Sequence, residues 1–314
     1  MTEVNTQVEV VESTEIQKAI AKLGGFVVYE FPSQAIADSI KVTLTEGLLL
    51  EQKFVPCGKF DQVKKGFMAF SGEGDNMLLS VKGSTMFQVT TQETKPHAAK
   101  VKKECRIAEA KYKLDNGIEK LDSETKGIIK LTVIESLIPE TTPNDPVTTL
   151  LWLTGNKLIV GVPTYSKAED FVDVVRFATD SCPVKPIEVV DDVQENLTTL
   201  LEKQYCENIV LMDLVHLEHA AAKGIVKFEK TSIYDIEYKK HLQEGCVVSK
   251  MQMSNEERCT FTLNKDFECS GVKIAKDVLS STKDLGALII TVDEINNTVK
   301  ELVEVFGGEV NEEA

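Results

Sequence analysis

The chain has 314 residues, of which 42% are hydrophobic and 27% are charged, and this balance excludes wholesale disorder. No apolar run approaches the roughly 20 residues that a membrane-spanning helix needs. The first residues also lack the basic and apolar regions of a signal peptide. We therefore expect a cytoplasmic protein with no membrane partner. The formal net charge of −15, taken alone, argues against a nucleic-acid partner.

The charge is distributed unevenly along the chain. Ten Lys or Arg residues stand against six Asp or Glu residues between Lys95 and Lys130, and four stand against one between Lys53 and Gly66. By contrast, residues 187–220 and 284–314 each carry eight acids and one Lys. Because polyanion binding depends on local potential, basic surfaces on this acidic chain can still bind nucleic acid. The alternative is a basic helix face that is merely solvated.

The seven cysteines are scattered along the chain and include no Cys-x-x-Cys pair. A disulfide framework or a four-cysteine zinc site would show closer pairing. We therefore predict reduced thiols that are mostly buried.

Residues 1–23 are predicted to form an N-terminal appendage, and residues 24–92 a tip domain that contributes part of a sheet. Residues 26–31 predict a strand that Pro32 ends. Ser33 is placed to cap the helix that follows, whose apolar positions recur every four residues. Residues 77–89 have the pattern of a hairpin that turns at Gly83-Ser84.

Residues 93–146 are predicted to form a basic helical segment and a Pro-rich loop. The first helix, 97–114, is amphipathic with lysines on its outer face. It breaks near Asn116-Gly117, and a second helix runs from about Ser123 to Pro139. The apolar positions of the first helix alternate at spacings of four and three: Val101, Cys105, Ala108 and Tyr112.

Residues 147–314 are predicted to form a central and C-terminal α+β dimerisation region. Two apolar strands flank Gly155-Asn156, which is a hairpin signal. Ser166 and Glu169 have the spacing of a capping box at the start of a helix. Further strands are predicted at 224–230, 246–253, 258–264 and 286–292, and a closing helix from about Asp293 to Gly307. The fold class is therefore α+β, with antiparallel sheets and long helices.

Two groups of residues could hold a metal ion, and each has a structural alternative. His216 and His219 could lie one turn apart on an exposed helix, but they lack a third ligand at a recognised zinc spacing. Asp191 and Asp192 with Glu195 could coordinate magnesium for phosphodiester hydrolysis. Acids at a helix N-terminus are also what the helix dipole favours.

The Glu-x-Lys element of many nucleases occurs twice, at Glu51-Gln-Lys53 and at Glu237-Tyr-Lys239. This spacing is expected by chance in a chain so rich in Glu and Lys, and Glu237 lies in a predicted helical stretch. We therefore assign no catalytic residue, metal or cofactor, and regard a non-enzymatic role as the better interpretation.

Several stretches, in the same order along the chain, resemble the recombination-associated RdgC family. The resemblance covers about residues 24 to 310, and no single motif carries it. The matching stretches are Phe26-Val-Val-Tyr-Glu-Phe31, Phe54-Val-Pro-Cys-Gly58 with Lys64-Lys-Gly66-Phe67, Leu150-Leu-Trp152 to Lys167-Ala-Glu-Asp170, Gly224 to Lys250, and Gly286 to Phe306-Gly-Gly-Glu309.

The resemblance implies a three-part protomer that forms a ring-shaped homodimer, with duplex DNA in a basic hole and no sequence readout. It implies antagonism of a RecA-type recombinase and association with the nucleoid, and single-stranded DNA is a second expected partner. The interfaces are expected around 224–310 and 64–90. Candidate DNA contacts lie in the basic segment or match basic family positions: Lys120, Lys126, Lys130, Lys227 and Lys230. The alternatives are a metal-dependent exonuclease and a protein-binding decoy without DNA affinity.

The sequence departs from the family pattern in the basic segment. Arginine positions of the family correspond to Glu119 and Glu140, and an aromatic position corresponds to Thr142. Each Arg-to-Glu change replaces attraction for phosphate by repulsion. We therefore expect weaker DNA binding than is typical of the family.

Overall fold

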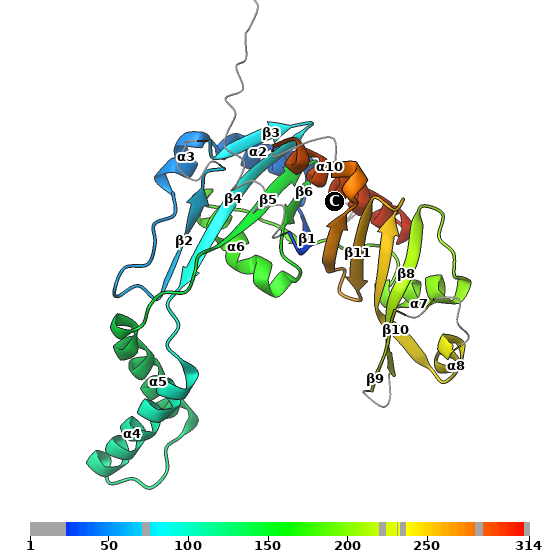
Figure 1. Cartoon of the computed structure of the whole chain (residues 1–314). Coiled ribbons are helices and arrows are strands. Elements are labelled where there is room, and N and C mark those ends of the chain that lie inside the picture. Colours follow the sequence, from blue (N-terminus) through cyan, green and yellow to red (C-terminus); the bar gives the residue numbers. More distant parts are fainter. Residues whose placement is uncertain are drawn as a thin grey trace, which may run out of the picture. The chain divides into compact units, whose positions relative to one another are not determined.

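The computed structural model describes residues 23–70, 76–219, 224–230, 232, 237–279 and 285–310 (Figure 1). The predicted N-terminal appendage, apart from Leu23, lies outside the described residues. The fold is α+β with a large sheet of antiparallel strands, as predicted. The chain divides into two compact units: a larger one within 1–51, 69–88 and 149–314, and a smaller one of 52–68 and 89–148.

The first part of the larger unit follows the predicted pattern closely. Ser33 accepts a hydrogen bond from the backbone N–H of Ile36 at 3.4 Å and so caps the first helix. The hairpin turns at Lys82-Gly83, one residue earlier than predicted, and both residues have positive φ. The elements are β1 (Gly25–Glu30), α2 (Gln34–Thr43), α3 (Glu46–Glu51), β3 (Leu78–Val81), β4 (Ser84–Glu93), β5 (Val147–Thr154), β6 (Lys157–Val160), α6 (Tyr165–Ala178) and β7 (Lys185–Pro186).

The second part of the larger unit is a run of antiparallel strands covered by helices. Across both parts of the larger unit, paired strands follow the order β5-β6-β1-β12-β11-β10-β8-β9. One apolar core joins alternate residues of β8, β10 and β11 to buried residues of α7 and α10. The elements are α7 (Val193–Lys203), β8 (Ile209–His219), β9 (Ile225–Glu229), α8 (Glu237–Gln243), β10 (Cys246–Asn255), β11 (Cys259–Asn264), β12 (Cys269–Ile274), α9 (Lys276–Leu279) and α10 (Leu285–Val305).

Two predicted elements of the larger unit are wrong. Residues 286–292 form the first half of α10 and not a strand, because their buried residues continue the helical spacing of the second half. His216 and His219 lie on β8 and not on a helix. Strands β8 and β12 were not predicted at all.

The predicted capping box of α6 is also wrong. The N-cap is Thr164, which makes no side-chain capping bond. The carboxylate of Glu268, from a distant turn, accepts the backbone N–H of Tyr165 at 2.8 Å instead. Glu169 accepts the Tyr29 hydroxyl at 2.7 Å and contacts Arg176, so its carboxylate is engaged elsewhere.

The smaller unit contains β2 (Val63–Met68) and a helical hairpin of α4 (Ala98–Asn116) and α5 (Ser123–Leu137), followed by the short helix η1 (Ile138–Glu140). The predicted break between the helices is confirmed, since Gly117 caps α4 in the left-handed conformation with φ of 63°. Asp122 caps α5 by accepting the N–H of Thr125 at 2.7 Å.

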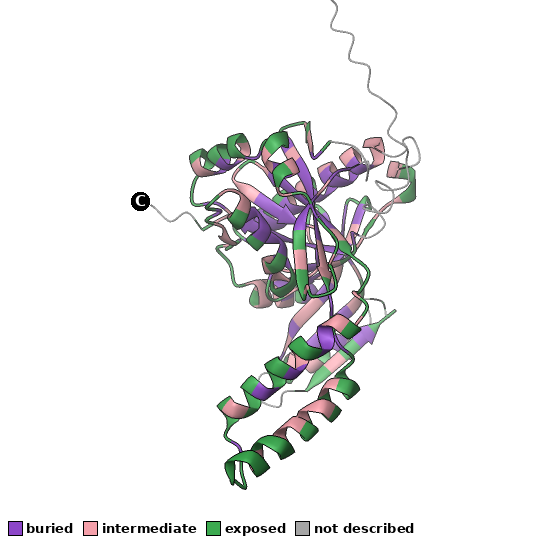
Figure 2. Ribbon diagram, turned by 90° about the vertical axis from the view of Figure 1, so that its left-hand side faces the viewer, coloured by how far each residue is buried: buried purple, intermediate pink, exposed green. Residues whose placement is uncertain are grey.

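The two helices of the hairpin share a small core. Four buried residues come from α5 and the turn before it: Leu121, Ile129, Val133 and Leu137. Three predicted core positions of α4 pack on them, namely Val101, Cys105 and Ala108, whereas the fourth, Tyr112, is exposed. Most of the remaining hairpin surface is exposed (Figure 2).

The predicted state of the cysteines is confirmed. All seven are free thiols, four of them buried and three half-buried. Among the described residues, no helix has the length and apolarity to span a bilayer.

Candidate nucleic-acid interface

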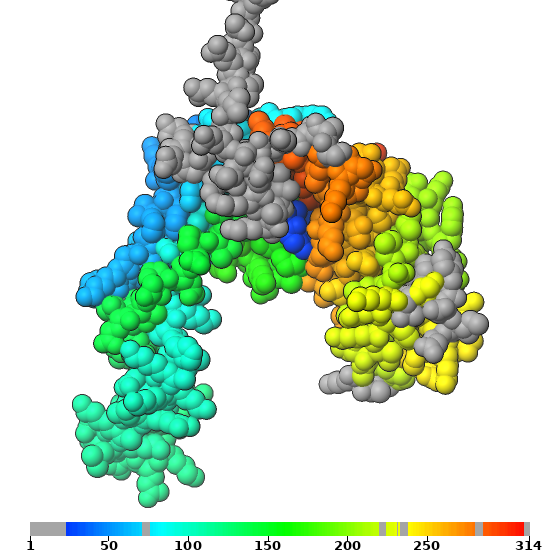
Figure 3. Space-filling model, in the orientation of Figure 1, coloured from blue at the N-terminus to red at the C-terminus, as the bar shows by residue number. Residues whose placement is uncertain are grey.

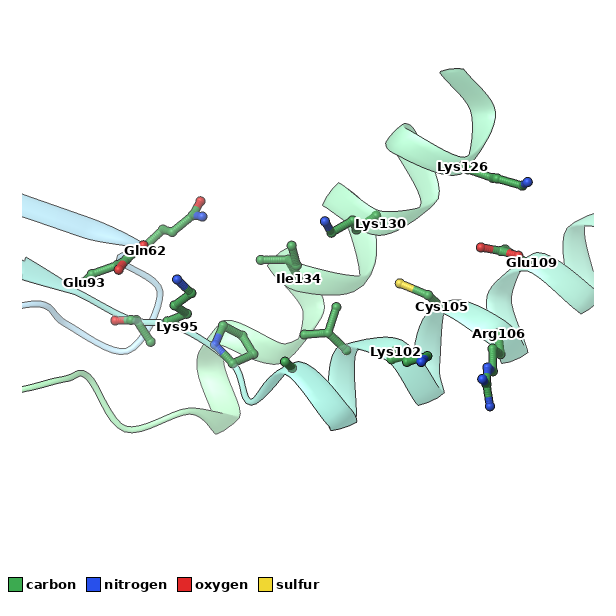
Figure 4. Close-up of a pocket in the computed structure, with 14 residues that line it drawn as sticks. Gln62, Glu93, Lys95, Lys102, Cys105, Arg106, Glu109, Lys126, Lys130 and Ile134 are labelled. Carbon is green, nitrogen blue, oxygen red and sulfur yellow. The ribbon is translucent and has the colours of Figure 1, made fainter. Parts of the chain in front are cut away.

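A cleft of about 720 Å³ runs along the α4–α5 hairpin in the smaller unit (Figure 4). Its apolar lining includes Val101, Cys105 and Ile134. Five cations surround this apolar surface: Lys95, Lys102, Arg106, Lys126 and Lys130. Figure 3 shows the side chains of α4 and α5 forming one continuous surface along the hairpin.

Helical spacing explains why these cations gather. Lys126 and Lys130 are four residues apart on α5, and Lys102 and Arg106 are four apart on α4, so each pair shares one helix face. In Figure 4, Cys105 points from α4 toward α5, whereas Arg106 points away from α5. The cleft therefore has cations on both helices beside an apolar floor.

Acidic groups reduce the positive charge of the hairpin. Glu93 and Glu109 line the cleft, so five cations and two acids give its lining a formal charge of +3. Outside the cleft lining, Lys100 Nζ lies 2.8 Å from Glu140 Oε2. The hydrogen bond from Lys100 lowers the pKa of Glu140, and this pair cancels one further cation.

Thr94 lies in the wall of the cleft with its hydroxyl enclosed by the protein. Its side chain is buried, and its hydroxyl has no hydrogen-bond partner among the described residues. A buried hydroxyl without a partner costs free energy unless a ligand or water satisfies it.

The structure brings together only some of the predicted site residues. Lys126 and Lys130 both line the cleft, whereas Lys120 is exposed in the turn between the helices, outside the cleft lining. Lys227 and Lys230 belong to the larger unit, on β9 and directly after it. Both side chains are exposed.

Lys227 belongs to a polar row that crosses the sheet of the larger unit. It lies opposite His216 of β8, which in turn lies opposite Lys250 of β10, and Lys250 lies opposite Asn264 of β11. Residues 215 and 217 point into the core, so alternation along β8 places His216 on the other face of the sheet.

His216 is neutral at pH 7 in this row. Burial, followed by the charges of Lys227 and Lys250, lowers its pKa from the ordinary value of 6.5. Its Nε2 lies 3.7 Å from Glu229 Oε1, which is longer than a hydrogen bond. The row therefore brings two positive charges together on this face of the sheet, those of Lys227 and Lys250.

Sequence reasoning missed four cations that the structure adds. Lys95, Lys102 and Arg106 line the cleft, and Lys250 completes the sheet row. The i, i+4 spacing of Lys102 and Arg106 was available in the sequence as a signal. Lys250 could be found only from strand register, because its partner strand β8 was not predicted.

The patterns weighed as metal sites have structural roles. Asp192 caps α7 by accepting the N–H of Glu195 at 2.8 Å, and Asp191 accepts a bond from Asn196. His216 and His219 lie three residues apart on a strand, so their side chains leave opposite faces. In the part of the chain that the structure describes, no group of three His, Cys, Asp or Glu residues could hold a metal.

The structure thus defines an α+β protein with antiparallel strands and a cationic cleft on an acidic chain. A family model described as "Putative exonuclease, RdgC" matches residues 26–309. This chain belongs to the RdgC family.

Three relatives share the name Recombination-associated protein RdgC. The relative from Proteus mirabilis is 24% identical over 286 residues, covering 84% of this chain and 92% of its own. That from Mannheimia succiniciproducens is 25% identical, with 84% and 91% covered. That from Actinobacillus pleuropneumoniae is 27% identical, with 86% and 93% covered.

Proposed function

We propose that this protein binds DNA without sequence preference, as a homodimer that encircles or coats the duplex, and modulates RecA-type recombination. The observation that carries the proposal is the group of five cations around the hairpin cleft, in a chain of net charge −15. The name shared by the relatives supports the link to recombination. Association with the nucleoid would follow from DNA binding.

The chemistry of the cleft favours phosphate over base recognition. Four of its five cations are lysines, whose ammonium groups act as point charges on flexible stems. Specific base contacts rely mainly on bidentate side chains such as Arg, Asn and Gln. Phosphate contacts release counterions, so binding should weaken steeply with salt and depend little on sequence.

The homodimer is part of the proposal. Symmetric dimers are the commonest closed assembly, and a two-protomer ring needs two contact surfaces on each protomer. We assign these surfaces to the regions 224–310 and 64–90.

A titration of labelled duplexes tests the proposal. Two duplexes of unrelated sequence should bind with equal affinity, and the affinity should fall steeply between two salt concentrations. In the variant K126A/K130A, the negative slope of log K against log salt should become shallower by roughly 1.8, at about 0.9 for each of the two lost phosphate contacts. The control K203A removes an exposed lysine of α7, outside the cleft and both proposed interfaces, and should behave as wild type.

The outcomes separate the candidate functions. No binding of either duplex at low salt would overturn DNA binding and favour the decoy, a role that the Lys100–Glu140 pair also favours. The family description favours the exonuclease alternative. Magnesium-dependent degradation of labelled DNA that EDTA abolishes would support it, and intact DNA at high protein excess would exclude it.

A further inference from the structure

Phe60 is an exposed aromatic residue in a chain that buries nearly all its phenylalanines. Eleven of the thirteen are buried, whereas Phe60 is 76% exposed and Phe177 is 75% exposed. An exposed Phe side chain forgoes the stabilisation that burial of its apolar surface would give. Two further residues of the same segment are exposed and apolar, Val55 and Val63.

The loop that presents Phe60 is held at both ends. Gln92 Oε1 accepts the backbone N–H of Cys57 at 2.7 Å, and the Gln62 carbonyl accepts the N–H of Thr94 at 2.8 Å. Between these anchors, Asp61 Oδ2 accepts the N–H of Gly58 at 2.8 Å and closes a turn. The ring of Phe60 therefore lies on a turn that hydrogen bonds already hold in place. Binding does not have to bear the entropic cost of ordering this loop.

The loop is also positively charged. Between Lys53 and Gly66 there are four lysines and one acid, Asp61. Lys59 Nζ lies 5.8 Å from the centroid of the Phe60 ring, within the range of a cation–π contact. Lys64 Nζ lies 3.2 Å from Asp61, so the one acid of the segment is already paired.

We propose that Phe60 is a stacking platform for an unpaired DNA base, with the neighbouring lysines on the phosphates of a single strand. Grooves that bind single strands combine cations along the backbone with aromatic rings on which bases stack. A duplex keeps its bases stacked on each other and offers no free base face to a surface ring. The proposal rests on DNA binding as proposed above and adds a preference for single-stranded regions.

The variant F60A tests the platform, with F177A as a matched control in the larger unit. Fluorescence polarisation with labelled oligo(dT) should show a roughly 5- to 150-fold loss of affinity in F60A, the range for one stacked base. The affinity of F60A for a duplex should change less than twofold, and the salt slope should be unchanged because no charge is removed. F177A should bind both ligands as wild type does.

A spectroscopic variant provides a second readout. The chain has one Trp, Trp152, and it is fully buried. In F60W, saturating oligo(dT) should therefore quench the fluorescence of the introduced indole, and in F177W it should not. Quenching in F60W alone would support a base stacked at this position.

Three results would overturn the inference. The first is that F60A binds oligo(dT) with the affinity of wild type. If wild type also binds duplex, this result leaves the proposed function intact. The second is an equal loss of affinity for oligo(dT) and duplex. The third is a lower oligomer mass of F60A by light scattering with unchanged oligo(dT) binding. That result would make the Phe60 side chain a contact between two protomers. Wild type that binds neither ligand would instead overturn the proposed function itself.

Discussion

Glu140 affects the basic surface in two ways at the scale of single residues. The family resemblance leads us to expect an arginine at this position, and the acid that stands there also engages Lys100 at 2.8 Å. Replacing it with arginine would remove the acid, add a cation and release Lys100. Glu119, exposed in the turn between α4 and α5, adds a second acid near the end of the hairpin.

The variant E119R/E140R should therefore bind DNA more tightly than wild type and with a steeper salt dependence. Each added phosphate contact should make the negative slope of log K against log salt steeper by about 0.9. Duplex titrations at several salt concentrations measure both effects.

A charge reversal elsewhere on the hairpin is the matched control for this variant. Glu135 is exposed on α5 and lies five residues after Lys130, which places it about 140° around the helix from that cleft residue. E135R should change affinity much less than the double variant. If E119R/E140R binds no better than wild type, DNA does not follow this hairpin.

At the scale of elements, local signals predicted the hairpin better than the closing sheet. The α4–α5 pair is specified by signals in its own sequence: apolar spacing, an Asp cap and a glycine at the break. The start of α10 is a continuous apolar run of β-branched and small residues, for which periodicity cannot separate a strand from a buried helix. The cap of α6 comes from Glu268, more than 100 residues away, so no local pattern could reveal it.

The candidate site divides in the same way. Lys126 and Lys130 were predictable because they lie in a dense basic segment with helical spacing. The row of Lys227, His216 and Lys250 depends on the register of three strands, two of which are far apart in sequence. Even correct strand bounds would leave that register undetermined, because β8 and β10 are paired with irregularities.

Two glycines of the smaller unit should respond in opposite directions to alanine. A Cβ on Gly66 would lie 2.7 Å from the backbone nitrogen of Phe54 and 2.8 Å from the Gln52 carbonyl, where segment 52–54 pairs with β2. Gly127 lies in α5, and a Cβ there would meet nothing within 4 Å. G66A should cost about 1–3 kcal/mol as overpacking does. G127A should stabilise by about 0.5–1 kcal/mol, the usual gain in a helix interior.

Denaturant unfolding, with the midpoint and slope fitted separately, measures both glycine variants. The comparison is internally controlled because each substitution adds the same methyl group to the same unit. A G66A protein as stable as wild type would contradict the close backbone approach at β2.

At the scale of the whole molecule, a ring-shaped dimer has two contact surfaces, either of which can hold the protomers together. Two protomers that meet at two separate surfaces stay together when either surface is weakened. Ile225 on β9 is 60% exposed within the proposed interface at 224–310, and Ser80 on β3 is exposed within the one at 64–90. These positions allow each surface to be weakened without disturbing the core.

Light scattering at micromolar concentration should therefore give wild type twice the protomer mass of 34.8 kDa. I225E and S80R should each keep the dimer mass, because one intact surface still joins the protomers, and the combined variant should be monomeric. Each single variant should also release DNA faster than wild type, since an opened ring no longer has to be broken before a duplex leaves. A monomeric wild type would contradict the dimer, and a monomeric single variant would mean that one surface alone joins the protomers and that no ring closes.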